Sequence, residues 1–267
     1  MSTTIARPGR VLISGAAGGL GAATARRFAA DGARVALTDI NAEGLEVVAK
    51  EVNGLALPAD GTSREALHDV VERTVEEFGG VDAVIAAQGA QISSSTSPKS
   101  HDNWTRSLDV NLNGAFYLAA ESLPHLVQSK GSIVLVSSSA GLFAGPSGAA
   151  GYTAAKTGII GLTRWLAREY GPRGVRVNAV SPGWIRTQLG EDAMKYLAER
   201  DGLTLEDAYR AATAHIPLRR VADPAEIAAV CAFLTSSDAS MVTGHTLVAD
   251  GGGAVVDSST EAFDQPG

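Results

Sequence analysis

Short apolar runs alternate along the chain with longer segments in which apolar residues recur on one helical face. The runs expected to be strands are 11–14, 34–38, 55–59, 81–87, 132–136, 175–180 and 246–248. The segments expected to be helices are 22–31, 42–52, 67–78, 104–128, 152–170 and 224–234, with a looser helical stretch at 188–217. Consecutive parallel strands need a helical crossover between them. This order therefore predicts an α/β fold, a doubly wound parallel sheet of about seven strands with helices on both faces.

No linker or repeat divides the sequence, so the whole chain, 1–267, is expected to form a single domain. Residues 188–217 carry scattered apolar side chains, and we expect them to form a lid that selects the substrate. The polar tail, 257–267, is expected to be loose. Pro124 is expected to kink its helix or to end the first part of it.

Composition narrows the range of partners and compartments. The formal net charge is −7 and no basic stripe is present, so nucleic acid is not an expected partner. No apolar run reaches the ~20 residues that span a bilayer, and residues 1–9 lack the apolar centre of a signal peptide. The single cysteine, Cys231, stands in an apolar segment and is expected in the core. We therefore expect a cytoplasmic protein that does not bind membranes.

A glycine-rich turn, residues 14–21, separates the first expected strand from the first expected helix. Glycines let a backbone approach a pyrophosphate closely, and a helix N-terminus presents free N–H groups and the positive end of a dipole. The spacing is Gly15-x-x-x-Gly19-x-Gly21, and the flanking residues of the expected cradle are Ser14 and Leu20. A turn that only packs tightly is the alternative.

Asp39 ends the second expected strand and precedes Ile40. An acid at this place in a nucleotide-binding βαβ unit accepts hydrogen bonds from the ribose hydroxyls, and it repels a 2′-phosphate. Neither residues 16–20 nor position 40 contain Arg or Lys, so the sequence predicts NAD rather than NADP as cofactor. The alternative is that Asp39 caps the helix 42–52.

Tyr152 and Lys156 are four residues apart and therefore share a helical face. A phenol has a pKa near 10, and an ammonium group within ~4–6 Å would lower that pKa toward neutrality. The pair could then exchange a proton with a substrate hydroxyl or carbonyl, although an ordinary surface pair is the alternative. A serine cluster, 137–139, ends the strand before this helix.

Together these motifs resemble the short-chain dehydrogenase/reductase family, over about residues 8–253. The resemblance is carried by these residues: the turn 14–21, Asp60, Asn111, Ser137 to Ser139, Tyr152, Lys156, Pro182, Gly183, Thr187 and Asp250 to Gly252. It implies a Rossmann-type fold and a nicotinamide cofactor. Helices 104–128 and 152–170 would pair subunits in a homotetramer.

The resemblance also implies a role for each matching residue. Tyr152 would be the general acid/base, and Lys156 would lower its pKa and hold the nicotinamide ribose. Ser138 would hydrogen-bond the substrate oxygen, and Asn111 would anchor a water that leads protons to solvent. The residues implied to bind the cofactor are Ser14, Gly15, Gly19, Leu20, Gly21, Asp39, Ile40, Asp60, Gly61, Ala87, Gly89, Tyr152, Lys156, Pro182, Gly183, Ile185 and Thr187.

The sequence departs from the family pattern in three places. The first turn residue is usually Thr and is Ser14 here. The usual Asn-Asn-Ala-Gly after the fourth strand is Ala86-Ala87-Gln88-Gly89, and Gln88 could partly replace the lost amides. The catalytic serine is Ser139 by the usual spacing to the tyrosine, but Ser138 by the surrounding residues. We prefer Ser138, because loops absorb insertions more easily than strand ends do.

The expected function is that of an NAD-dependent oxidoreductase that interconverts a secondary alcohol and a ketone, on an apolar or cyclic small molecule. The alternatives are a catalytically silent nucleotide-binding regulator and a dehydratase or epimerase on the same fold. The histidines are not paired at metal-ligand spacing, so no metal is expected. Trp104 and Trp165 are expected in the core or between helices, and Trp184 either lines the pocket or packs elsewhere.

Overall fold

Seven strands form the sheet in the computed structural model, which describes residues 6–96 and 103–257. They are β1 (Arg10–Ser14), β2 (Arg34–Thr38), β3 (Leu55–Ala56), β4 (Ala83–Ala86), β5 (Ser132–Val136), β6 (Arg176–Pro182) and β7 (Thr246–Ala249). Their order across the sheet is β3-β2-β1-β4-β5-β6-β7, and every neighbouring pair is parallel. The predicted doubly wound parallel sheet is confirmed.

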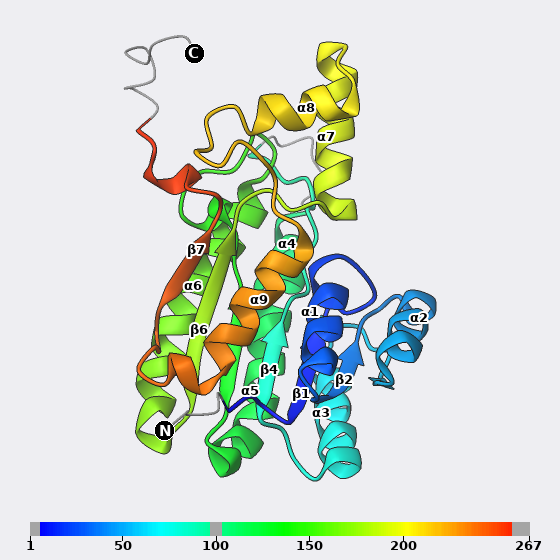
Figure 1. Cartoon of the computed structure of the whole chain (residues 1–267), viewed down its shortest axis with the longest axis vertical. Helices are drawn as coiled ribbons and strands as arrows, with labels where there is room; N and C mark the ends of the chain where they lie inside the picture. The colour runs from blue at the N-terminus through cyan, green and yellow to red at the C-terminus, as the bar shows by residue number, and fades with distance from the viewer. Residues whose placement is uncertain (1–5, 97–102, 258–267) are drawn as a thin grey trace.

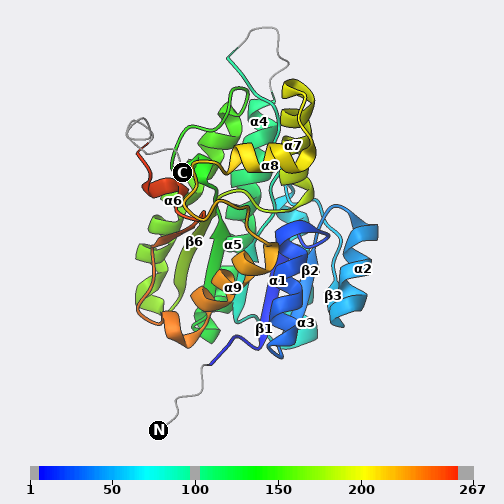
Figure 2. The same ribbon diagram turned by 45° about the horizontal axis from the view of Figure 1, so that its top comes forward.

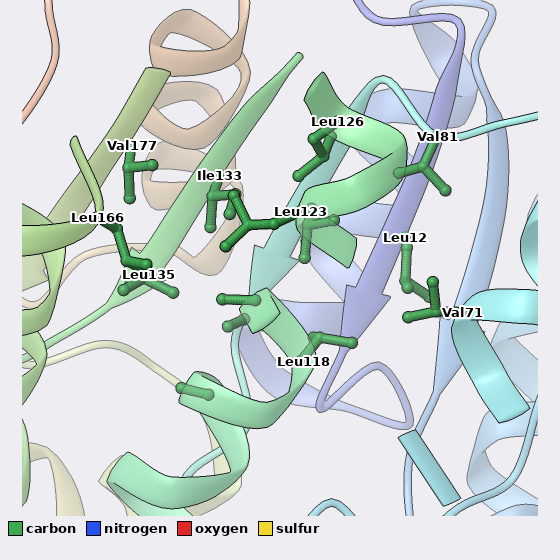
Figure 3. Close-up of a cluster of buried hydrophobic side chains, with 14 of the residues drawn as sticks. Leu12, Val71, Val81, Leu118, Leu123, Leu126, Ile133, Leu135, Leu166 and Val177 are labelled. Atoms are coloured by element: carbon green, nitrogen blue, oxygen red, sulfur yellow. The ribbon is translucent and has the colours of Figure 1, made fainter. Parts of the chain in front are cut away.

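Helices cover both faces of this sheet (Figure 1). They are α1 (Gly19–Ala30), α2 (Ala42–Val52), α3 (Arg64–Phe78), α4 (Trp104–Leu108), α5 (Gly114–Ser129), α6 (Ala150–Tyr170), α7 (Gln188–Asp201), α8 (Leu205–Ala212) and α9 (Pro224–Thr235). Helices α3, α5 and α6 bury one apolar cluster against the sheet, and α1, α2 and α9 bury a second. In the first cluster Leu118 and Leu123 of α5 point toward the strands (Figure 3). Cys231 of α9 lies in the second cluster, as predicted.

The long helix expected at 104–128 is interrupted. A π-helical turn, Asp109–Asn113, separates α4 from α5. Pro124 lies inside α5 and does not end it, so the prediction that it ends part of the helix is wrong. The interruption falls at Asn111 instead, and π-turns occur often at functional sites.

The strands β1 and β4 are neighbours, but the chain continues from them in opposite directions across the sheet. From β1 it runs to β2, and from β4 it runs to β5. In open α/β sheets the crevice at such a switch point, beside the carboxyl ends of the strands, binds ligands. Helices α7 and α8 lie beyond the carboxyl ends of the strands (Figures 1 and 2). They pack against each other through a buried apolar cluster of Met194, Ala208 and Tyr209. The predicted lid segment thus lies over the expected ligand site.

Among the described residues, no helix combines the length and the apolar character that crossing a bilayer would require. The predicted loose tail lies outside the described residues except for Asp257. Trp104 and Trp165 have 40% and 56% of their surface exposed, so neither lies in the core, and packing between helices is the alternative that remains for them.

Candidate active site

A cavity of about 900 Å³ opens at the switch point, within the size range of ligand sites. Its walls come from the β1–α1 turn, from the residues that follow β2, β4, β5 and β6, and from α6. All the predicted cofactor-binding residues line it, together with Ser138, Tyr152 and Lys156. Asn111 is the one predicted site residue that does not line the cavity.

The glycine turn has the geometry of a phosphate cradle. Gly15 and Gly19 have φ angles of +66° and +54°, which side chains disfavour. A Cβ on Gly15 would lie 2.8 Å from the Ala87 carbonyl carbon, and one on Gly21 would lie 2.0 Å from the Gly15 oxygen. No side chain caps the N-terminus of α1, whereas Asn41 caps α2. The first N–H groups of α1 are thus left for a ligand, and this cradle fits a dinucleotide pyrophosphate.

Asp39 joins the glycine turn to the end of β2. Its carboxylate accepts hydrogen bonds from the Ala17 N–H at 3.1 Å and from the Asn41 N–H at 2.9 Å. Asn41, and not Asp39, caps α2 by accepting from the Gly44 N–H. The alternative of Asp39 as the helix cap is therefore wrong, and its carboxylate is held at the rim of the cavity.

The loop after β3 is fixed by Asp60 and Gly61. Asp60 accepts hydrogen bonds from the Thr62 N–H at 2.9 Å and from the Thr62 hydroxyl at 2.8 Å, and these lower the pKa of its carboxyl. The Gly61 carbonyl rests against Gly114 of α5, where a Cβ would lie 2.3 Å from that oxygen. Ala59, Asp60, Gly61 and Thr62 line the cavity, and this loop fits the edge of a flat ring.

The end of β4 departs from the family pattern, and Gln88 rebuilds part of it. The Ser14 hydroxyl donates a hydrogen bond to the Gln88 side-chain oxygen and joins the ends of β1 and β4. The Gln88 side-chain nitrogen is buried without a hydrogen-bond partner in the described structure. Gln88 thus ties the end of β4 to the end of β1 through its side-chain oxygen, which fits the expectation that it partly replaces the missing amides.

Tyr152 and Lys156 face each other within the cavity wall. The Lys156 Nζ lies 5.6 Å from the centre of the Tyr152 ring and donates a hydrogen bond of 2.9 Å to the Val136 carbonyl. Only 2% of Lys156 is exposed, and this burial lowers its pKa to about 8. Strand β5 therefore fixes the position of the ammonium group.

The Tyr152 hydroxyl is paired with Ser138. Burial raises the pKa of Tyr152, and the side-chain hydrogen bond with Ser138 lowers it by less. The expected lowering of the Tyr152 pKa by Lys156 is therefore wrong in direction for this structure. Lys156 is buried and Tyr152 is half-buried, and desolvation disfavours the charged form of each.

Asn111 belongs to the π-helical turn, and its side chain lies next to Gly89. Its amide nitrogen donates to the carbonyls of Ala90 and Ser107 at 2.9 and 3.0 Å, and its oxygen accepts from the Ala90 N–H. A Cβ on Gly89 would lie 3.1 Å from the Asn111 oxygen and 3.3 Å from the Lys156 Nζ. The missing side chain at Gly89 leaves these two polar groups close together.

Several cavity residues have no sequence motif to mark them. Gln91, Arg106, Phe143, Trp184, Gln188 and Leu189 also line the cavity. Most lie in loops or at a helix start, where periodicity carries no signal. Of the two positions left open for Trp184, the one in the pocket wall is confirmed. In the described part of the chain, no three His, Cys, Asp or Glu side chains gather closely enough to hold a metal.

The parallel sheet, the glycine cradle and the Tyr152–Lys156 pair beside it are the features with which the chain is compared to known proteins. Residues 15–254 match the family model described as enoyl-(acyl carrier protein) reductase. The chain belongs to the short-chain dehydrogenase/reductase family of oxidoreductases.

Relatives in this family act on several substrates. Levodione reductase of Leifsonia aquatica is 37% identical over 254 residues, covering 91% of this chain and 92% of its own. The meso-2,3-butanediol dehydrogenase of Serratia marcescens is 34% identical and covers 92% and 95%.

Solved structures agree with this assignment. The crystal structure of levodione reductase has a TM-score of 0.87 at 34% identity and covers 94% of this chain and 100% of its own. An actinorhodin polyketide ketoreductase solved with NADPH has a TM-score of 0.86 at 29% identity, with coverage of 92% and 97%.

Proposed function

We propose that the protein is an NAD-dependent oxidoreductase that interconverts a secondary alcohol and a ketone on an apolar or cyclic small molecule. The observation that carries the proposal is the hydrogen bond of the half-buried Tyr152 hydroxyl with Ser138, beside the buried Lys156, in the cavity that holds the glycine cradle. A bound nicotinamide would supply the hydride chemistry. The test is NADH formation from a panel of cyclic and aromatic secondary alcohols.

In this proposal the protein's own residues manage the proton. Tyr152 gives its phenol proton to the ketone oxygen in reduction, and in oxidation its phenolate form takes the proton of the substrate hydroxyl. Ser138 holds that oxygen, and its hydrogen bond to Tyr152 supports Ser138 over Ser139 for this role. A raised pKa keeps the phenol protonated at neutral pH, which is the form that reduces a ketone.

Lys156 and Asn111 support this proton transfer. The Val136 carbonyl holds Lys156 in place, where its ammonium would also reach the nicotinamide ribose. Asn111 would anchor a water that connects Lys156 with solvent, since its oxygen and the Lys156 Nζ both face the space beside Gly89. The proposal that the substrate is apolar is supported by three apolar side chains in the cavity wall, those of Ile92, Phe143 and Leu189.

The preference for NAD rests on Asp39. Its fixed carboxylate would accept the ribose hydroxyls and repel a 2′-phosphate, so we expect kcat/KM to favour NAD over NADP by at least about tenfold. Asp39→Asn keeps the shape and removes the charge, and should reduce this preference by about tenfold or more. Glu43→Gln, in the first turn of α2, is the matched control and should leave the preference as it is. A wild-type protein whose kcat/KM favours NADP over NAD would refute the preference for NAD. The actinorhodin polyketide ketoreductase, which has the same fold, was solved with NADPH.

The cytoplasmic location and the homotetramer stay predictions from the sequence. Two exposed aromatic residues, Phe116 of α5 and Trp165 of α6, lie on the helices expected to pair subunits. Light scattering tests the assembly, and a monomeric mass would contradict it.

A further inference from the structure

A second, smaller cavity of about 170 Å³ lies beside the main one. Its wall is formed by the start of α9, by the segment that follows the lid and by the residues after β7. Its lining residues include Trp184, Arg220, Ala222, Glu226, Val230 and Asp250. We call this space the side cavity.

The charged groups of the side cavity are already paired within the chain. The Arg220 guanidinium donates to both Glu226 oxygens, at 2.6 and 2.7 Å. The Asp250 carboxylate accepts from the N–H groups of Gly252 at 2.9 Å and Ala254 at 2.6 Å. The remaining lining side chains are apolar, so the side cavity suits an uncharged, apolar group.

Trp184 is the one described residue that lines both cavities. Its backbone is anchored, because its carbonyl accepts a hydrogen bond of 2.9 Å from the Ala222 N–H and Ile185 bridges to Ala222. Its side chain packs against the apolar cluster of the lid that contains Met194 and Tyr209. Trp184 is thus held from two sides at the boundary between the two spaces.

We propose that Trp184 is a specificity-determining residue that sets the upper size of the substrate. The indole closes the main cavity toward the side cavity, so a ring with a bulky apolar substituent is excluded. When the indole is removed, the two spaces join, and the substituent can occupy the side cavity. This inference rests on the proposed alcohol–ketone oxidoreductase function, and it adds a size limit and the residue that imposes it.

The test compares two substrates in Trp184→Ala. Cyclohexanol and a tert-butyl-substituted cyclohexanol are oxidised with NAD by the wild type and the variant. We expect the ratio of kcat/KM for the bulky over the small alcohol to rise by about tenfold or more in the variant, because a few methyl groups in an apolar pocket are worth that much. Trp184→Phe should give an intermediate ratio. NADH affinity and circular dichroism check that each variant is folded.

Val230→Ala is the matched control, because Val230 lines only the side cavity. It enlarges that space behind an intact Trp184 and should leave the ratio unchanged. The proposal would be overturned if Trp184→Ala lost the same activity toward both alcohols. It would also be overturned if the ratio of kcat/KM rose in Val230→Ala as much as in Trp184→Ala.

A binding measurement separates this inference from the proposed function. The melting temperature of each NADH-loaded protein is measured with cyclohexanone and with its tert-butyl derivative. A larger stabilisation of Trp184→Ala than of the wild type by the bulky ketone supports the size limit even if no alcohol is oxidised. Absence of oxidation by the wild type across the alcohol panel counts against the proposed function alone. If the bulky ketone stabilises Trp184→Ala no more than the wild type, the proposal that Trp184 limits substrate size is contradicted.

Discussion

Replacing Tyr152 by phenylalanine should lower kcat by about two to four orders of magnitude. The substitution removes only the hydroxyl oxygen that pairs with Ser138, and it leaves the ring beside Lys156. Proton transfer to and from the substrate oxygen then has no donor at that place, while the glycine cradle and Asp39 are untouched. The affinity for NADH, measured by fluorescence titration, should therefore remain close to that of the wild type.

Tyr170→Phe provides the control for this experiment. Tyr170 ends the same helix, far along it from Tyr152, and the Arg173 guanidinium lies 4.7 Å from the centre of its ring. Loss of its hydroxyl should not change kcat. Turnover that persists in Tyr152→Phe at the level of Tyr170→Phe would remove Tyr152 from the proposed role.

Lys156→Met should abolish most of the activity and stabilise the fold at neutral pH. Activity should fall by about a hundredfold or more, because the variant loses the ammonium that is proposed to reach the nicotinamide ribose and to connect with the water at Asn111. The free energy of unfolding should rise by roughly 1–3 kcal/mol, because an ammonium that is almost fully buried is replaced by an apolar side chain of similar length.

The pH dependence of this stability difference follows from the lowered pKa of Lys156. Burial lowers that pKa from 10.5 to about 8, so between these values the unfolded chain binds more protons than the folded one. Wild-type stability therefore gains a contribution as pH rises through this window, and Lys156→Met lacks it. The stability gap between the two proteins should be largest near pH ~7 and should shrink by pH ~9.5.

Urea unfolding at the two pH values measures this gap. Lys50→Met on α2 is the control, because Lys50 is exposed and carries the same charge. It should show neither the gain at neutral pH nor the convergence. A Lys156→Met protein that is less stable than the wild type near neutral pH would contradict the burial penalty described here.

Much of the fold could be predicted because its strands are buried on both faces and end at clear breaks. The predicted bounds of β2, β5 and α2 agree with the structure. Parallel strands bring their carboxyl ends to one edge, so Ser14, Asp39 and Ser138 could be placed together from the order of elements alone.

The rest depends on tertiary packing that leaves no local pattern. The π-helical turn at Asn111 shifts the backbone register inside a helix whose apolar spacing is otherwise continuous. The direction of the Tyr152 pKa could not be predicted from its spacing to Lys156, because it depends on how deeply both groups are buried. Likewise, a tryptophan in an amphipathic helix suggests burial, but Trp165 faces outward.

The most direct test of the proposed function is the fate of a carbinol hydrogen. Wild-type protein is incubated with NAD and cyclic secondary alcohols that carry deuterium on the carbinol carbon, and the nicotinamide product is analysed by mass spectrometry. The account predicts deuterated NADH from at least one alcohol, and none when Tyr152→Phe is used. A protein that binds NADH tightly but forms no deuterated NADH from any alcohol in the panel would contradict it.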